Sequence, residues 1–153
     1  MKKNLCLPFV LLFLFLCTAF ETLQAQDRPT NSELGFIVGE PTGLSAKFWT
    51  GGNKAFDLGL AWSFSGQGSM HIHSSYLIHK TIENNPDLML YYGIGGRLLM
   101  ESDPKVGVRI PVGIQYLIPD SPLSLFFELA PMLNLIPETD FDVNGGLGLR
   151  YFF

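Results

Sequence analysis

Residues 141–153 read Phe-Asp-Val-Asn-Gly-Gly-Leu-Gly-Leu-Arg-Tyr-Phe-Phe. Large apolar side chains stand at most of the odd positions, namely Phe141, Val143, Leu147, Leu149, Tyr151 and Phe153. Small, polar or charged residues stand at most of the even positions, namely Asp142, Asn144, Gly146, Gly148 and Arg150. Alternation with a period of two places successive side chains on opposite faces of an extended chain. The segment is therefore predicted to be a β-strand with one apolar face and one polar, glycine-rich face.

The same alternation repeats backwards along the chain. It is clear in residues 123–135, 106–116, 88–101 and 56–64, weaker in 34–38 and 44–48, and least regular in 70–79, where Ser74 falls on the apolar face. Turn signals rich in Gly, Pro, Asn, Asp and Ser separate these segments at 40–43, 51–53, 65–68, 84–87, 102–104, 119–122 and 137–140. Short alternating segments joined by such turns are typical of antiparallel strands in consecutive hairpins. We therefore expect eight antiparallel strands.

Composition narrows the class of protein. The 153-residue chain is 47% apolar but only 16% charged, and its net charge is −4. Soluble domains average about 25% charged residues. The chain nevertheless lacks the runs of about 20 apolar residues that build transmembrane helices. Its apolar content excludes disorder, and the negative charge without a basic cluster argues against a nucleic-acid partner.

The amino terminus has the layout of a secretory signal peptide. Lys2 and Lys3 precede the uncharged residues 5–20, and Ala25 offers a small residue for cleavage. We predict a signal peptide over 1–25, a short periplasmic segment over 26–32 and a barrel over 33–153. A retained anchor helix is the alternative, although the apolar run is short for a bilayer core of about 30 Å.

The two faces of the strands indicate which side meets lipid. Most strand glycines share the polar face, including Gly35, Gly59, Gly93, Gly95, Gly107, Gly113, Gly146 and Gly148. An eight-stranded barrel has an interior just wide enough to be filled by side chains, and small residues suit it. Outer-membrane barrels turn the apolar face to lipid. The predicted fold is thus an all-β, eight-stranded antiparallel up-and-down transmembrane barrel in the outer membrane. A periplasmic lipocalin-like binder of small ligands, with its apolar face inward, is an alternative.

Eight charged residues fall on the predicted interior face. Four are basic and four acidic: Lys47, Arg97, Arg109 and Arg150, and Asp57, Glu101, Glu128 and Asp142. Buried charges are tolerated when they are paired and hydrogen-bonded. Counting from the turns places Arg109, Glu128 and Arg150 at similar heights, which predicts a network centred on Glu128. This network is expected to plug the lumen; alternatively, it acts as the gate of a small ion channel.

Known proteins show related features. The alternating residues Leu147, Leu149, Tyr151 and Phe153 resemble the terminal strand of bacterial outer-membrane proteins, which ends in phenylalanine. That resemblance implies recognition by the barrel-assembly machinery. The mature chain also resembles a family of small outer-membrane barrels of unknown function, with the architecture of the OmpA-type transmembrane domain. The resembling stretches are 39–45, 91–97, 108–113 and 127–131.

The sequence carries few residues for catalysis. His71, His73 and His79 share the interior face, where they are more simply part of the polar filling than metal ligands. Ser75 also points inward, away from any lipid substrate. We therefore expect no enzyme activity, metal or cofactor.

The predicted outer loops, near 40–43, 65–69, 102–105 and 137–140, are short. Receptors and adhesins usually display longer ones. We expect a monomer in outer-membrane lipid with a structural or surface-exposed role. Pro111 and Pro131 fall in mid-strand, where we expect bulges or missing ladder bonds.

Overall fold

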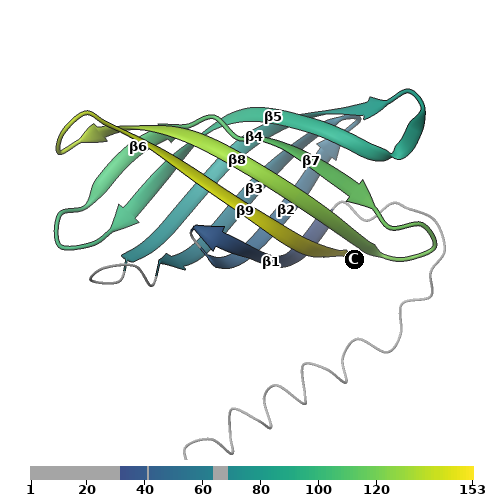
Figure 1. Cartoon of the computed structure of the whole chain (residues 1–153), viewed down its shortest axis with the longest axis horizontal. Coiled ribbons are helices and arrows are strands. Elements are labelled where there is room, and N and C mark those ends of the chain that lie inside the picture. The colour runs from purple at the N-terminus through teal and green to yellow at the C-terminus, as the bar shows by residue number, and fades with distance from the viewer. Residues whose placement is uncertain (1–31, 41, 64–68) are drawn as a thin grey trace, which may run out of the picture.

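The computed structural model describes residues 32–40, 42–63 and 69–153, so the predicted signal peptide lies outside the described residues. The described residues form nine antiparallel strands (Figure 1). Their bounds are β1 (Ser32–Glu40), β2 (Thr42–Gly51), β3 (Lys54–Ser63), β4 (Ser69–Ile82), β5 (Asn85–Met100), β6 (Lys105–Arg109), β7 (Val112–Leu117), β8 (Leu123–Ile136) and β9 (Asp140–Phe152). No helix in this part of the chain is long and apolar enough to cross a membrane.

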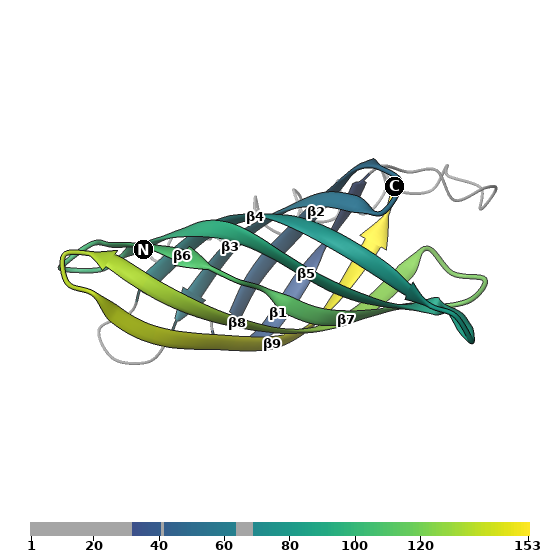
Figure 2. The same cartoon turned by 90° about the horizontal axis from the view of Figure 1, so that it is seen from above.

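The sheet closes on itself. From β1 to β5 each strand pairs with the next, and β1 also pairs with β9, which pairs with β8. Both β6 and β7 lie between β5 and β8, so together they fill one place in the ring. The predicted eight-stranded antiparallel barrel is confirmed, and its strands run obliquely around the axis (Figures 1 and 2).

One predicted turn lies earlier in the chain than expected. The sequence suggested 84–87, but the turn is formed by Glu83 and Asn84, and β5 already includes Pro86. The Asn85 side chain accepts a hydrogen bond from the Asp87 backbone N–H at 3.2 Å, which supports the first residues of the strand. Proline is tolerated there because the start of a strand need not donate a ladder bond.

The exterior of the barrel is an apolar belt. Large apolar side chains of every strand are exposed, with Phe36 at 62%, Val38 at 66% and Phe141 at 67% of their full accessible area. The opposite face is buried and polar, and Lys47 and Arg150 are at most 1% exposed. The faces therefore have the orientation of a membrane barrel, opposite to that of the lipocalin-like alternative.

Glycines make room for aromatic rings inside the barrel. Phe126 lies directly opposite Gly148 on the neighbouring strand, and Tyr91 lies opposite Gly113. A Cβ atom built on either glycine would overlap the ring of its partner. Rings that cover cross-strand glycines are known to support sheets at such positions. The interior glycines thus set how much side-chain volume the narrow lumen accepts.

We predict that Gly148→Ala destabilises the barrel by about 1–3 kcal/mol, because the added methyl group overpacks the Phe126 ring. The matched control is Gly96→Ala, where the nearest atom to the new Cβ would be 3.8 Å away; we expect a change within about 0.5 kcal/mol. Urea unfolding of both variants in detergent micelles measures the difference. Equal free energies of unfolding would contradict the steric role of Gly148.

Candidate functional site

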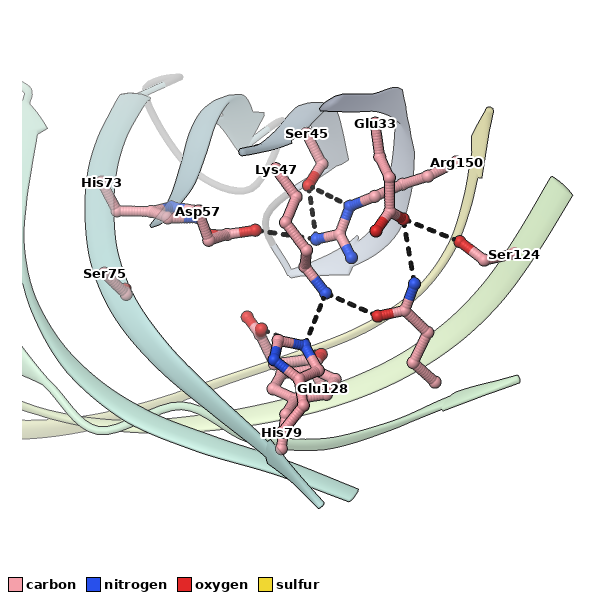
Figure 3. A network of polar contacts seen from close by, with 12 residues as sticks. Glu33, Ser45, Lys47, Asp57, His73, Ser75, His79, Ser124, Glu128 and Arg150 are labelled. Carbon is pink, nitrogen blue, oxygen red and sulfur yellow. Dashed lines mark hydrogen bonds and ion pairs between the residues drawn. The ribbon is translucent and has the colours of Figure 1, made fainter. Parts of the chain in front are cut away.

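The lumen is the part of the molecule where chemically active side chains gather. Fourteen polar or charged residues of the described chain are buried there or at its ends: Glu33, Ser45, Lys47, Asp57, His71, Ser75, His79, Arg97, Arg109, Gln115, Ser124, Glu128, Asn134 and Arg150. Each comes from the polar positions of an alternating strand, so the closed sheet directs all of them toward one axis. Most of their contacts fall into three groups, and Figure 3 shows part of this network; a fourth set surrounds Arg97.

Asp57 on β3 is the centre of the first group. Its carboxylate lies 2.8 Å from Arg150 Nη2 and 3.8 Å from Arg109 Nη1. His73 Nε2 is 3.4 Å from the same carboxylate. Arg150 also donates from Nε and Nη2 to the Ser45 hydroxyl at 3.0 and 2.7 Å. One carboxylate therefore joins strands that lie on different sides of the barrel.

Glu128 on β8 organises the second group. One of its oxygens accepts a hydrogen bond from Arg109 Nη2 at 2.6 Å, and the other accepts one from the Tyr91 hydroxyl at 3.0 Å. Arg109 Nη1 also donates to the Ser75 hydroxyl at 3.1 Å. Because Arg109 reaches toward both Glu128 and Asp57, this guanidinium connects the two groups.

The third group lies closer to the end of the barrel at which β1 begins and β9 ends. Lys47 Nζ donates to Gln115 Oε1 at 2.6 Å and contacts His79 Nε2 at 3.1 Å. Gln115 Nε2 in turn donates to the Glu33 carboxylate at 2.9 Å. The Glu33 carboxylate also accepts hydrogen bonds from Trp49 Nε1 at 2.7 Å and from the Ser124 hydroxyl at 2.9 Å. The Gln115 amide thus stands between the lysine and the glutamate and bonds to both.

A further ion pair lies toward the opposite mouth. Arg97 Nη2 is 3.1 Å from Asp142, whose side chain is 44% exposed. Arg97 also donates from Nε and Nη2 to the side-chain oxygen Oδ1 of the buried Asn134 at 3.1 and 2.9 Å. Asp142 therefore pairs with a lumen arginine at this mouth of the barrel.

Seven of the eight charged residues predicted for the interior line the lumen or its mouth, and Glu101 does not. The strand β5 ends at Met100, so Glu101 lies in the following bend and forms a surface ion pair with Lys105 at 3.5 Å. The buried Glu33 takes its place in the charge count, which stays at four basic and four acidic groups. The sequence signal that Glu33 faces inward is its position two residues before Gly35, which also faces inward.

Of the two arginines predicted to meet at Glu128, Arg109 does so and Arg150 binds Asp57 instead. Arg150 stands opposite Ser124 in the ladder between β8 and β9, whereas Glu128 stands opposite Gly146. Arg150 therefore lies four residues along β9 from Gly146, the residue opposite Glu128. The offset follows from the register of the hairpin, because Asn134 pairs with Asp140, and Glu128 lies six residues from Asn134 whereas Arg150 lies ten residues from Asp140.

Pro111 interrupts its strand without changing the register, whereas Pro131 lies within the continuous strand β8. Arg109 pairs with Gly95 and Val112 with Tyr92, so Pro111 is in line with Gly93 although no strand is formed at 110–111. Gly93 N–H donates to the Pro111 carbonyl at 2.9 Å, but proline has no N–H to return the bond. The prediction of a missing ladder bond at Pro111 is confirmed.

Pro131, in the neighbouring strand β8, likewise has no N–H to donate to the ladder. Ile110 N–H donates to the Pro131 carbonyl at 2.9 Å, and again no bond returns. On the lumen side, Arg109 ends β6 and Gly113 lies beneath the Tyr91 ring, while Glu128 binds both Arg109 and Tyr91. The Glu128 group therefore ties together the two sides of the interrupted strand.

The three histidines do not form a metal site. His73 binds Asp57, His79 contacts Lys47, and His71 lies 3.3 Å from the Ser69 hydroxyl. Within residues 32–40, 42–63 and 69–153, no group of three or more His, Cys, Asp or Glu side chains is arranged to hold a metal ion.

The lumen has little free volume. A cavity of about 10 Å³ adjoins His73, Arg109 and Glu128, and it is about the size of one water molecule. The other lining residues are Ile37, Glu40, Asn144, Gly145 and Gly146. The described side chains therefore leave room for no more than about one water molecule at this point.

Comparison with solved structures places the fold. The N-terminal β-barrel domain of Pseudomonas aeruginosa OprF matches with a TM-score of 0.64 and 14% identity, over 82% of this chain and 100% of that one. Neisserial surface protein A (NspA) matches with a TM-score of 0.52 and 11% identity, over 80% and 93%. The chain has the fold of the OmpA-type eight-stranded outer-membrane barrels. No protein-family model and no curated protein sequence matches the chain.

We predict that Asp57→Asn destabilises the barrel by about 3–5 kcal/mol, since it leaves Arg150 and Arg109 buried without their shared anion. The control is Glu101→Gln, which removes a surface pair worth at most about 1 kcal/mol. Urea unfolding in micelles compares the two variants. A smaller effect for Asp57→Asn than for Glu101→Gln would contradict the central position of Asp57.

Proposed function

We propose that the chain is an integral outer-membrane barrel with a structural or surface-exposed role, inserted by the barrel-assembly machinery after export by its signal peptide. The observation that carries the proposal is the pairing of an exposed apolar exterior with a charged, filled interior. In lipid, a closed barrel satisfies its backbone hydrogen bonds internally. The proposed role involves no catalysis, cofactor or nucleic acid, and the working form is a monomer.

The carboxyl-terminal residues support the assembly part of the proposal. Leu147 and Leu149 are 58% and 39% exposed along β9, beside Tyr151, and Phe153, directly after the strand, is 41% exposed. The strand β9 pairs with β1 and so completes the ring. A row of exposed side chains on a ring-closing strand is accessible to an assembly factor before closure.

The location is tested by fractionation of cells that express the full chain. We expect the protein in outer-membrane fractions after carbonate washing, because the apolar belt is stable only in lipid. The folded form should also migrate differently from the heated form in gel electrophoresis. Release into the soluble periplasmic fraction would instead support the lipocalin-like alternative.

A small ion channel is the second candidate function. The observation in its favour is Lys47, whose Nζ bonds to Gln115 and His79 and lies 4.8 Å from the centre of the Tyr91 ring rather than against a carboxylate. A cation held by neutral groups can change partners with less loss than one in a close ion pair. Such an exchange would open the third group of contacts.

Planar-bilayer recordings of the purified protein separate the two functions. We expect no conductance steps from the wild-type barrel, because the buried side chains fill the lumen. Gln115→Ala, which removes the amide between Lys47 and Glu33, serves as a comparison with a loosened plug. Reproducible steps from the wild-type protein would favour the channel and contradict the plug.

A further inference from the structure

The apolar belt is hollowed over β1, β2 and β3. A groove of about 340 Å³ lies on the outside of β1, β2 and β3, near the ends of these strands that are remote from Ser32. Its walls are Phe36 and Val38 on one side, Leu44 below and Trp62 on the other side, with Ile37, Thr42 and Gly43 completing the lining. The hollow exists because Thr42, directly opposite Trp62 in the ladder, is a small residue between large ones.

The groove offers an occupant few hydrogen-bonding groups. Among the lining residues that the structure describes, Thr42 alone has a polar side chain. The Thr42 hydroxyl is turned back into the β1–β2 turn, where it accepts from the Gly39 N–H at 3.2 Å and donates to the Gly39 carbonyl at 3.0 Å. The other side chains are apolar, so the groove suits an occupant without polar groups.

We propose that this groove holds one acyl chain of a membrane lipid. The groove is continuous with the exposed apolar belt, so lipid chains are the molecules already next to it, and the inference rests on the proposed membrane location. A 150 Å³ apolar cavity accepts a benzene molecule, so 340 Å³ has room for on the order of a dozen carbon atoms. That is a substantial part of a fatty-acyl chain.

A protein partner fits the groove less well. Stable protein interfaces use roughly 20–30 residues from each side. The groove has seven lining residues, and an extended hydrocarbon chain needs no more. A seated chain would contact Trp62 along one face of its indole ring.

The two tryptophans of the chain make the proposal measurable. Trp62 lines the groove, whereas Trp49 binds Glu33 in the lumen. Trp49→Phe therefore leaves Trp62 as the single fluorophore. The protein is reconstituted in phosphatidylcholine vesicles in which a rising fraction of the lipid carries bromine on its acyl chains, because bromine quenches indole fluorescence on contact.

We expect the fluorescence of Trp62 to fall linearly with the brominated fraction, since one resident chain dominates its contacts. The matched control places the only tryptophan on an open part of the belt, in the triple variant Trp49→Phe, Trp62→Phe and Ile94→Trp; Ile94 is 60% exposed. Several lipid chains contact such a position, so its quenching curve should bend. Thr42→Phe, which fills the groove, should lower the maximal quenching of Trp62.

Two results would overturn the proposal. One is a Trp62 curve that coincides with the position-94 curve; the other is quenching of Trp62 that Thr42→Phe leaves unchanged. Quenching at neither position would overturn the membrane location as well, which separates the two failures. If Trp49→Phe does not fold, the fluorescence of the wild type minus that of Trp62→Phe gives the quenching curve of Trp62. If Thr42→Phe does not fold, Thr42→Leu takes its place as the variant that fills the groove.

Discussion

Closure of an eight-stranded sheet is the constraint on which the rest of this molecule depends. A ring of this size leaves a lumen only as wide as a layer of side chains. Every inward residue must therefore be small, or must find a partner across the axis. The interior glycines beneath Phe126 and Tyr91 meet the first condition. The contacts of Asp57, Glu128 and Glu33 meet the second.

Three of the buried anions, Asp57, Glu128 and Glu33, each have more than one partner. Asp57 lies within ion-pair distance of two arginines and a histidine, and Glu128 binds an arginine and a tyrosine. Glu33 instead accepts hydrogen bonds from three neutral donors, Trp49, Gln115 and Ser124. Buried charge survives in a narrow lumen when its hydrogen-bonding capacity is used in this way. The same contacts reinforce the wall where Pro111 interrupts it.

Much of the fold and part of the site could be predicted from the sequence. Alternation is a local property, so strand number, the apolar exterior and the inward glycines follow from reading each segment alone. The alternating pattern predicted wrongly that Glu101 faces the lumen, because the strand ends one residue earlier, at Met100, and the backbone bends there. Gln115 and Tyr91 stand at polar-face positions of their alternating segments, but nothing in their local sequence indicates that Gln115 joins Lys47 to Glu33 or that Tyr91 binds Glu128.

The sequence by itself determined that this chain forms eight antiparallel strands with a lipid-compatible exterior and balanced charges inside. Only the tertiary structure decided which charges meet. The physical reason is that closing the sheet directs the inward side chains of strands far apart in the ring, such as β3 and β9, toward one narrow axis. Thus Arg150 binds Asp57, 93 positions away in the chain, rather than Glu128 on the adjacent strand.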